Sequence, residues 1–236
     1  MRVQGLDVLR GYAIVLMVIF HFSFDLNNFG YISTDMKHGL EWRYFRYVIV
    51  TMFVFLAGVS LYLANQNGID FQKAKRRFFT LLAASLLVTI GSYTQFPKTW
   101  IYFGILHFFL VASLVGLVFL RLPILSFIVG ANIILGYIFG YLSMHWLFEL
   151  LHAPLHLPVR YTEDLASFVP WFGVFLLGMS FAHYEIFTQR LFNNSFVNQK
   201  HRFNDGLSFL GSHSLVVYLL HQPIFFGAFL LIGIYF

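Results

Sequence analysis

The first apolar segment of the chain carries side chains that could perform acid–base chemistry. In a helix, which turns about 100° per residue, four polar residues of this segment fall on one stripe about 60° wide. They are Asp7, Arg10, His21 and Asp25. The helix rise from Arg10 to His21 is roughly 16 Å. The stripe therefore predicts a polar pathway that ends at an imidazole able to act as a general base. Asp25, one turn beyond His21, could orient the ring.

A plainer interpretation of the same stripe stays open. Asp7 and Arg10 have the i,i+3 spacing of a local ion pair, and His21 would then merely lie at the far membrane interface. In either interpretation, charged groups are costly in lipid, so the stripe must face protein or water.

A second polar face occurs near the C-terminus. Ser214, Tyr218 and His221 share one side of a helix, and Gln222 lies just beyond it. The face could form a pocket for the acceptor substrate, or its side chains could only bond neighbouring helices together. His213 lies outside this group and is expected to make a local hydrogen bond.

The remaining histidines give weaker signals. His107 is the lone histidine of an apolar segment, where a hydrogen-bonded core role is the usual one. His152 and His156 have i,i+4 spacing, but Pro154 lies between them and no carboxylate completes a zinc site. We expect no metal.

A cationic cluster lies before the third apolar segment. It consists of Lys73, Lys75, Arg76 and Arg77. At a membrane edge such residues fix topology and contact anionic lipid, and they could also hold the phosphates of a ligand such as coenzyme A.

The composition sets the class of protein. The chain has 236 residues, of which 59% are apolar and only 11% charged, with a mean hydropathy of +0.74. A water-exposed surface cannot be built from these residues, so the sequence indicates an integral membrane protein with no soluble module. The charge of +5 is ordinary for cationic cytoplasmic loops and does not indicate nucleic acid binding. Without cysteine, a disulfide and a cysteine nucleophile are excluded.

The apolar segments predict an all-α transmembrane bundle of about seven spans, forming one domain over residues 1–236. We expect spans at about 12–24, 43–65, 78–95, 100–120, 123–148, 168–184 and 207–236. The first is expected to be a retained helix and not a signal peptide, because Asp7 precedes it and no cleavage site follows. The last is expected to break at Gln222-Pro223 into half-spans 207–221 and 224–236.

The distribution of Lys and Arg predicts the orientation. With seven spans, the larger set of cations, including the 73–77 cluster and Arg202, collects on the side of the N-terminus. The positive-inside rule then places the N-terminus in the cytoplasm.

Four stretches resemble one family of membrane proteins. Residues 5–22, Met52–Ser60, Val169–Met179 and Ser214–Pro223 are similar, in the same order, to the heparan-alpha-glucosaminide N-acetyltransferase-like proteins. The most specific features are Leu-Arg-Gly with a downstream histidine and the later Tyr-Leu-Leu-His-Gln-Pro. The ten residues between Arg10 and His21 also resemble the spacing in the wider acyltransferase-3 superfamily.

The resemblance implies roles for these residues. His21 would be the catalytic base, and Arg10 would hold a phosphate or the carbonyl of the donor. Lysosomal family members place the key histidine in the loop after the first helix, so His38 is the alternative base. The implied reaction moves an acetyl or short acyl group from cytoplasmic acyl-coenzyme A to a hydroxyl or amino group of a sugar or glycan. The implied location is a bacterial inner membrane.

Two other functions stay open. A small-solute transporter or flippase would also need intramembrane charges, although no duplicated halves are visible. A membrane cytochrome would use His21, His107 and His221 as haem ligands, but these are not paired at matching depths. The acceptor, the acyl chain length and homo-oligomer formation are not fixed by the sequence.

Overall fold

The expected all-helical architecture is confirmed by the computed structural model, which describes residues 3–36, 39–158, 162, 164–192 and 202–235. In these residues no strand forms, and the only β-type pairing is a single bridge between Phe103 and Leu165. The helices are α1 (Gln4–Asn28), α2 (Leu40–Asn65), α3 (Phe71–Gln95), α4 (Ile105–Gly116), η1 (Leu117–Phe119), α5 (Pro123–Ile138), α6 (His145–His152), α7 (Phe168–His183), α8 (Glu185–Phe192), α10 (Arg202–Ser212) and α11 (Ser214–Tyr235).

Four of the described helices are long and apolar enough to cross a membrane. They are α1, α2, α3 and the Ser214–Gly233 part of α11. Three shorter apolar helices, Ile105–Phe119, Pro123–Ile138 and Phe168–His183, coincide with the other expected spans. Seven spans therefore stay a prediction.

The expected 123–148 segment is two helices and not one. Helix α5 ends at Ile138, and Gly140 has a φ of 78°, a left-handed conformation that glycine adopts without the steric penalty of a Cβ. Helix α6 begins only at His145.

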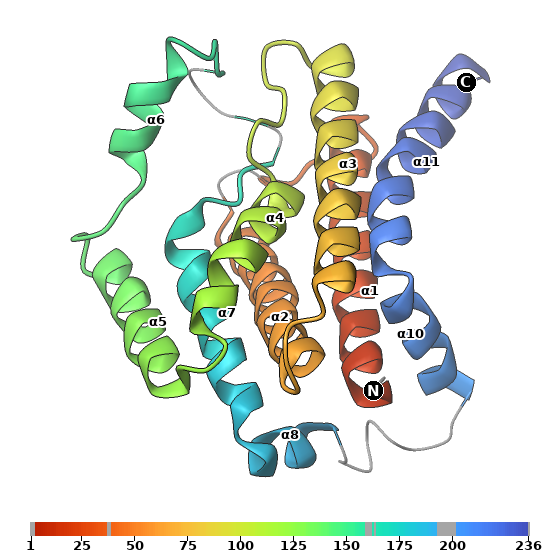
Figure 1. The fold of residues 1–236 in the computed structure, drawn as a ribbon. Coiled ribbons are helices and arrows are strands. Elements are labelled where there is room, and N and C mark those ends of the chain that lie inside the picture. The colour runs from red at the N-terminus through yellow and green to blue at the C-terminus, as the bar shows by residue number, and fades with distance from the viewer. Residues whose placement is uncertain (1–2, 37–38, 159–161, 163, 193–201, 236) are drawn as a thin grey trace. The chain divides into compact units, whose positions relative to one another are not determined.

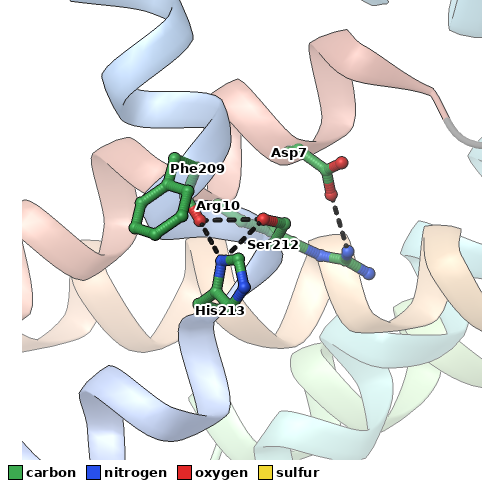
Figure 2. Close-up of polar contacts among 5 residues, drawn as sticks. All are labelled: Asp7, Arg10, Phe209, Ser212 and His213. Carbon is green, nitrogen blue, oxygen red and sulfur yellow. Dashed lines mark hydrogen bonds and ion pairs between the residues drawn. The ribbon is translucent and has the colours of Figure 1, made fainter.

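The expected break at Gln222-Pro223 is wrong in its position. Helix α11 continues through Pro223 to Tyr235, and the chain breaks at His213 instead. Figure 2 shows the side chains at this break, where Ser212 Oγ donates to the Phe209 carbonyl at 2.8 Å and His213 Nδ1 lies 2.9 Å from the same oxygen. These side chains satisfy an end-of-helix carbonyl. Pro223 removes only one backbone donor, which a membrane helix tolerates.

The chain forms two compact units. One comprises Met1–Leu56 and Ile186–Phe236, and the other comprises Ala57–Glu185. A single membrane domain over residues 1–236 stays a prediction.

In the first unit, α1 packs closely along α10 and α11 (Figure 1). A Cβ at Gly11 would overlap the Leu207 backbone, and a Cβ at Gly211 would overlap the backbone of Asp7. Small residues let membrane helices approach in this way. Farther along α1, Ile14 and Met17 form an apolar core with Ile49 of α2.

In the second unit, α5 and α7 cross at a glycine pair, and α4 contacts α7 and α3. A Cβ at either Gly130 or Gly173 would press on the other's carbonyl oxygen. Phe108 of α4 and Phe175 of α7 are fully buried, with ring centroids 6.3 Å apart.

Candidate functional site

The polar stripe of α1 begins with an ion pair. Arg10 Nη1 lies 3.2 Å from Asp7 Oδ1, and Asp7 is only 5% exposed (Figure 2). The i,i+3 pair that the plainer interpretation expects is therefore present. At the rise of an α-helix, His21 lies roughly 16 Å farther along α1.

His21 contacts two residues of α11. Its ring packs against the ring of His221 from α11, with centroids 4.9 Å apart, and Gln222 Nε2 lies 3.0 Å from His21 Nδ1. Phe20 packs edge-on against His21, and Phe225 packs edge-on against His221. The fold thus brings together residues from opposite ends of the chain in an apolar surrounding.

His221 is buried and is hydrogen-bonded to its own helix. It is 7% exposed, and its Nδ1 lies 2.7 Å from the Tyr218 carbonyl oxygen of the preceding helical turn. Among the described residues, neither His221 Nε2 nor Gln222 Oε1 has a hydrogen-bond partner, and both atoms are buried. Two polar atoms beside His21 are therefore available to a ligand.

Asp25 is fully buried, but it does not bond His21. Both of its carboxyl oxygens lack a hydrogen-bond partner among the described residues. The orienting contact that the one-turn spacing predicts is made by Gln222 instead. The spacing placed Asp25 on the correct face, but i,i+4 neighbours need not touch when a residue of another helix is nearer to the ring.

Of the other residues on the second polar face, Tyr218 lies close to His221 and Ser214 lies far from it. Tyr218 lies beside His221, with ring centroids 5.8 Å apart, and it also packs on the Ile14 and Met17 core. Ser214 is the first residue of α11, roughly 10 Å of helix rise before His221. His38, the alternative base, lies outside the described residues.

Two histidines have the local roles expected of them. Thr89 Oγ1 lies 3.0 Å from His107 Nε2, and the Gly104 N–H donates to His107 Nδ1 at 3.2 Å, so both ring nitrogens are occupied. His107 cannot ligate haem without losing one of these bonds. His213 bonds the end of α10, as described above.

The cationic cluster lies at the start of α3, in the second unit. Asp70 caps this helix by accepting from the Lys73 N–H at 3.1 Å, and Lys73 Nζ lies 3.0 Å from Asp70 Oδ2. The hydrogen bond from the Lys73 backbone lowers the pKa of Asp70 below its usual value. Capping and pairing therefore fix the first turn of α3.

An open hollow lies between the end of α2, the start of α3 and α4. Lys73 and Arg77 line it, together with Asn65 and Ser113. The Ser113 hydroxyl is buried, and the described residues offer it no hydrogen-bond partner. Lys75 and Arg76 are exposed and do not line this hollow. The sequence identified the cations, but it gave no sign of Ser113.

In the described part of the chain, no three His, Cys, Asp or Glu side chains are grouped as metal ligands. Apolar helices of membrane-spanning length and the family match below make this an integral membrane protein of the transferase class. The sequence matches the family described as heparan-alpha-glucosaminide N-acetyltransferase, catalytic, over residues 2–223. This match covers most of the chain, so the protein belongs to that family. No curated protein and no solved structure matches it.

Proposed function

We propose that the protein is a membrane acyltransferase that moves an acetyl or short acyl group from acyl-coenzyme A to a hydroxyl or amino group of a sugar or glycan. The family supports the class of reaction. The observation that carries the proposal is the histidine pair, in which the ring centroids of His21 and His221 lie 4.9 Å apart and the buried Nε2 of His221 has no hydrogen-bond partner among the described residues. Polar atoms left unsatisfied in an apolar site are a feature of binding and catalytic sites.

The chemistry needs little more than this pair. The acceptor oxygen or nitrogen bonds to the acyl carbon, the carbon–sulfur bond of the thioester breaks, and the proton of the acceptor ends on the departing thiolate. An imidazole can carry that proton, since it both accepts and releases one near neutral pH. No cysteine nucleophile is required, and the chain has none.

Gln222 holds the pair in place. Its amide bonds His21 while its side chain comes from the helix that carries His221, so the two rings are fixed against one another. Asp25 remains a proposed site residue, because its fully buried carboxyl group, one turn from His21, has no hydrogen-bond partner among the described residues. Arg10 remains the proposed contact for the donor at the other end of the stripe.

The hollow at the start of α3 is the proposed site for the phosphates of the donor. Two cations, Lys73 and Arg77, line it, and Ser113 adds a hydroxyl with no other partner in the described residues. A phosphate group takes charge-assisted hydrogen bonds from such donors. Lys75 and Arg76, which are exposed and adjacent in sequence, would add positive potential to the same turn of α3. Coenzyme A is cytoplasmic, so this proposal also places the N-terminus in the cytoplasm of a bacterial inner membrane.

The test is acetyl-coenzyme A binding and thioester cleavage by the detergent-purified protein. We expect binding measured by calorimetry and slow hydrolysis that His21→Ala abolishes while leaving binding unchanged. His145→Ala is the matched control, since His145 is an exposed histidine at the start of α6.

Two results would contradict the proposal. If neither acetyl-coenzyme A nor coenzyme A binds at millimolar concentration, the donor assignment is wrong, and transport of a polar solute becomes the leading function. If His21→Ala cleaves the thioester as fast as the wild type, the donor assignment stands but the histidine pair is not the reaction site.

A further inference from the structure

The hydrogen bonds around His221 define where its proton lies. Nδ1 is 2.7 Å from the Tyr218 carbonyl oxygen, and a carbonyl oxygen can only accept. Nδ1 of the neutral ring must therefore carry the hydrogen, which leaves a lone pair on Nε2. A neutral imidazole whose Nε2 is unprotonated is a base at that atom.

The environment of that atom points to a ligand. His221 Nε2 is buried, and no described residue offers it a hydrogen bond. Leaving a buried acceptor unsatisfied costs about 1–3 kcal/mol. The ring is nevertheless held in this orientation by its Tyr218 contact, and an N–H or O–H group of a bound substrate would satisfy the lone pair on Nε2.

In His21 the hydrogen lies on the other ring nitrogen, Nε2. The Gln222 side-chain N–H groups can only donate, and Gln222 Nε2 lies 3.0 Å from His21 Nδ1, which must then accept. The hydrogen of neutral His21 is therefore on its Nε2. Two rings with centroids 4.9 Å apart thus present one acceptor and one donor.

We propose that His221, and not His21, is the general base of the reaction, and that His21 is the hydrogen-bond donor. The proposal rests on the acyltransferase function proposed above and reverses the assignment that the sequence favours. His221 Nε2 takes the proton of the acceptor as its oxygen or nitrogen bonds to the acyl carbon. The His21 Nε2–H stabilises the negative charge that develops on the thioester oxygen, and the proton on His221 passes to the departing thiolate.

The discriminating variant is His221→Asn. An asparagine amide N–H can still donate to the Tyr218 carbonyl, but the variant has no atom at the Nε2 position and no basic nitrogen. With acetyl-coenzyme A as donor and D-glucosamine as the acceptor probe, we expect transfer to fall at least a hundredfold, while acetyl-coenzyme A binding and thermal stability stay close to wild type. A purely structural histidine would be replaced by asparagine with little loss.

A second measurement does not depend on activity. Nitrogen-15 NMR of histidine-labelled wild-type protein, with His221→Asn and His21→Asn used to assign the signals, reports which ring nitrogen is protonated. We expect Nδ1–H for His221 and Nε2–H for His21. Nε2–H on His221 would overturn the inference, and so would near wild-type transfer by His221→Asn.

These outcomes separate the two proposals. If the wild type neither binds nor cleaves acetyl-coenzyme A, the proposed function fails and the role of His221 fails with it. If the wild type transfers acetyl groups and His221→Asn does so equally well, only the assignment of His221 is wrong.

Discussion

Gln222 Nε2 lies 3.0 Å from His21 Nδ1, so an amide near the C-terminus fixes the ring of a histidine in the first helix. About two hundred residues of sequence separate them, and the close packing of α1 against α10 and α11 is what makes the contact. The reacting groups therefore depend on helix packing at some distance from the histidines as well as on their own chemistry.

Removing the amide tests this dependence. In Gln222→Leu the His21 ring loses the contact that orients it, and we expect transfer to fall about tenfold, the effect of one buried hydrogen bond. Affinity for acetyl-coenzyme A should not change. Steady-state kinetics check both quantities, and Gln189→Leu on the exposed face of α8 is the control. Equal losses in the two variants would show that Gln222 has no special role.

Replacing a glycine at the crossing of α1 and α10 tests the packing itself. In Gly211→Ala the added Cβ would overlap the backbone of Asp7, so the helices must move apart. We expect a loss of about 1–3 kcal/mol in the free energy of unfolding. Gly206→Ala in the same helix is the matched control, because nothing lies within 4 Å of its Cβ position. In thermal unfolding experiments in detergent, the midpoint temperature of Gly211→Ala should be lower than that of the wild type. The midpoint of Gly206→Ala should be unchanged or raised.

The residues that line the hollow at the start of α3 should determine the affinity for the donor. Lys73→Ala and Arg77→Ala remove cations that line it, whereas Lys75→Ala removes an exposed cation that does not. We expect the dissociation constant of acetyl-coenzyme A to rise about threefold to tenfold in the first two variants and to change little in the third. The difference should shrink at high salt. Weakening by Lys75→Ala alone would place the donor elsewhere.

The stability of the first turn of α3 should depend on pH through its N-terminal cap, Asp70. The Lys73 N–H lowers the pKa of Asp70, so the folded state favours the ionised carboxylate. This contribution is present above the usual carboxyl pKa and is lost as the pH falls through the lowered folded-state value. The protection of the Lys73 amide, measured as the ratio of its intrinsic to its observed hydrogen-exchange rate, should therefore fall on acidification. Asp70→Ala should show the lower protection already at neutral pH, whereas Asp70→Asn, which retains a capping oxygen, should not.

The sequence predicted those features that depend on a single helix. The period of 3.6 residues placed Asp7 and Arg10 in contact, and the same rule grouped Tyr218 with His221. Composition predicted an all-helical membrane protein. A lone His107 in a core role was also predictable, because a buried imidazole in an apolar helix needs hydrogen-bond partners.

Features that depend on contacts between helices were not predictable in this way. Gln222, and not Asp25, bonds His21, and no periodicity reveals which helix lies beside a given face. The helix break was placed at Pro223 because proline lacks a donor, but α11 continues through Pro223 and the break lies at His213. Proline alone does not decide where a membrane helix breaks, because neighbouring groups can make up for one lost backbone hydrogen bond.

The most direct test of the central claim is the transfer of radiolabelled acetyl from acetyl-coenzyme A to D-glucosamine by reconstituted protein. The wild type and His145→Ala should form labelled product at equal rates. His21→Ala and His221→Asn should each lose at least a hundredfold while still binding acetyl-coenzyme A. Undiminished product formation by both histidine variants would contradict the account, because the pair that α1 and α11 bring together would then take no part in the reaction.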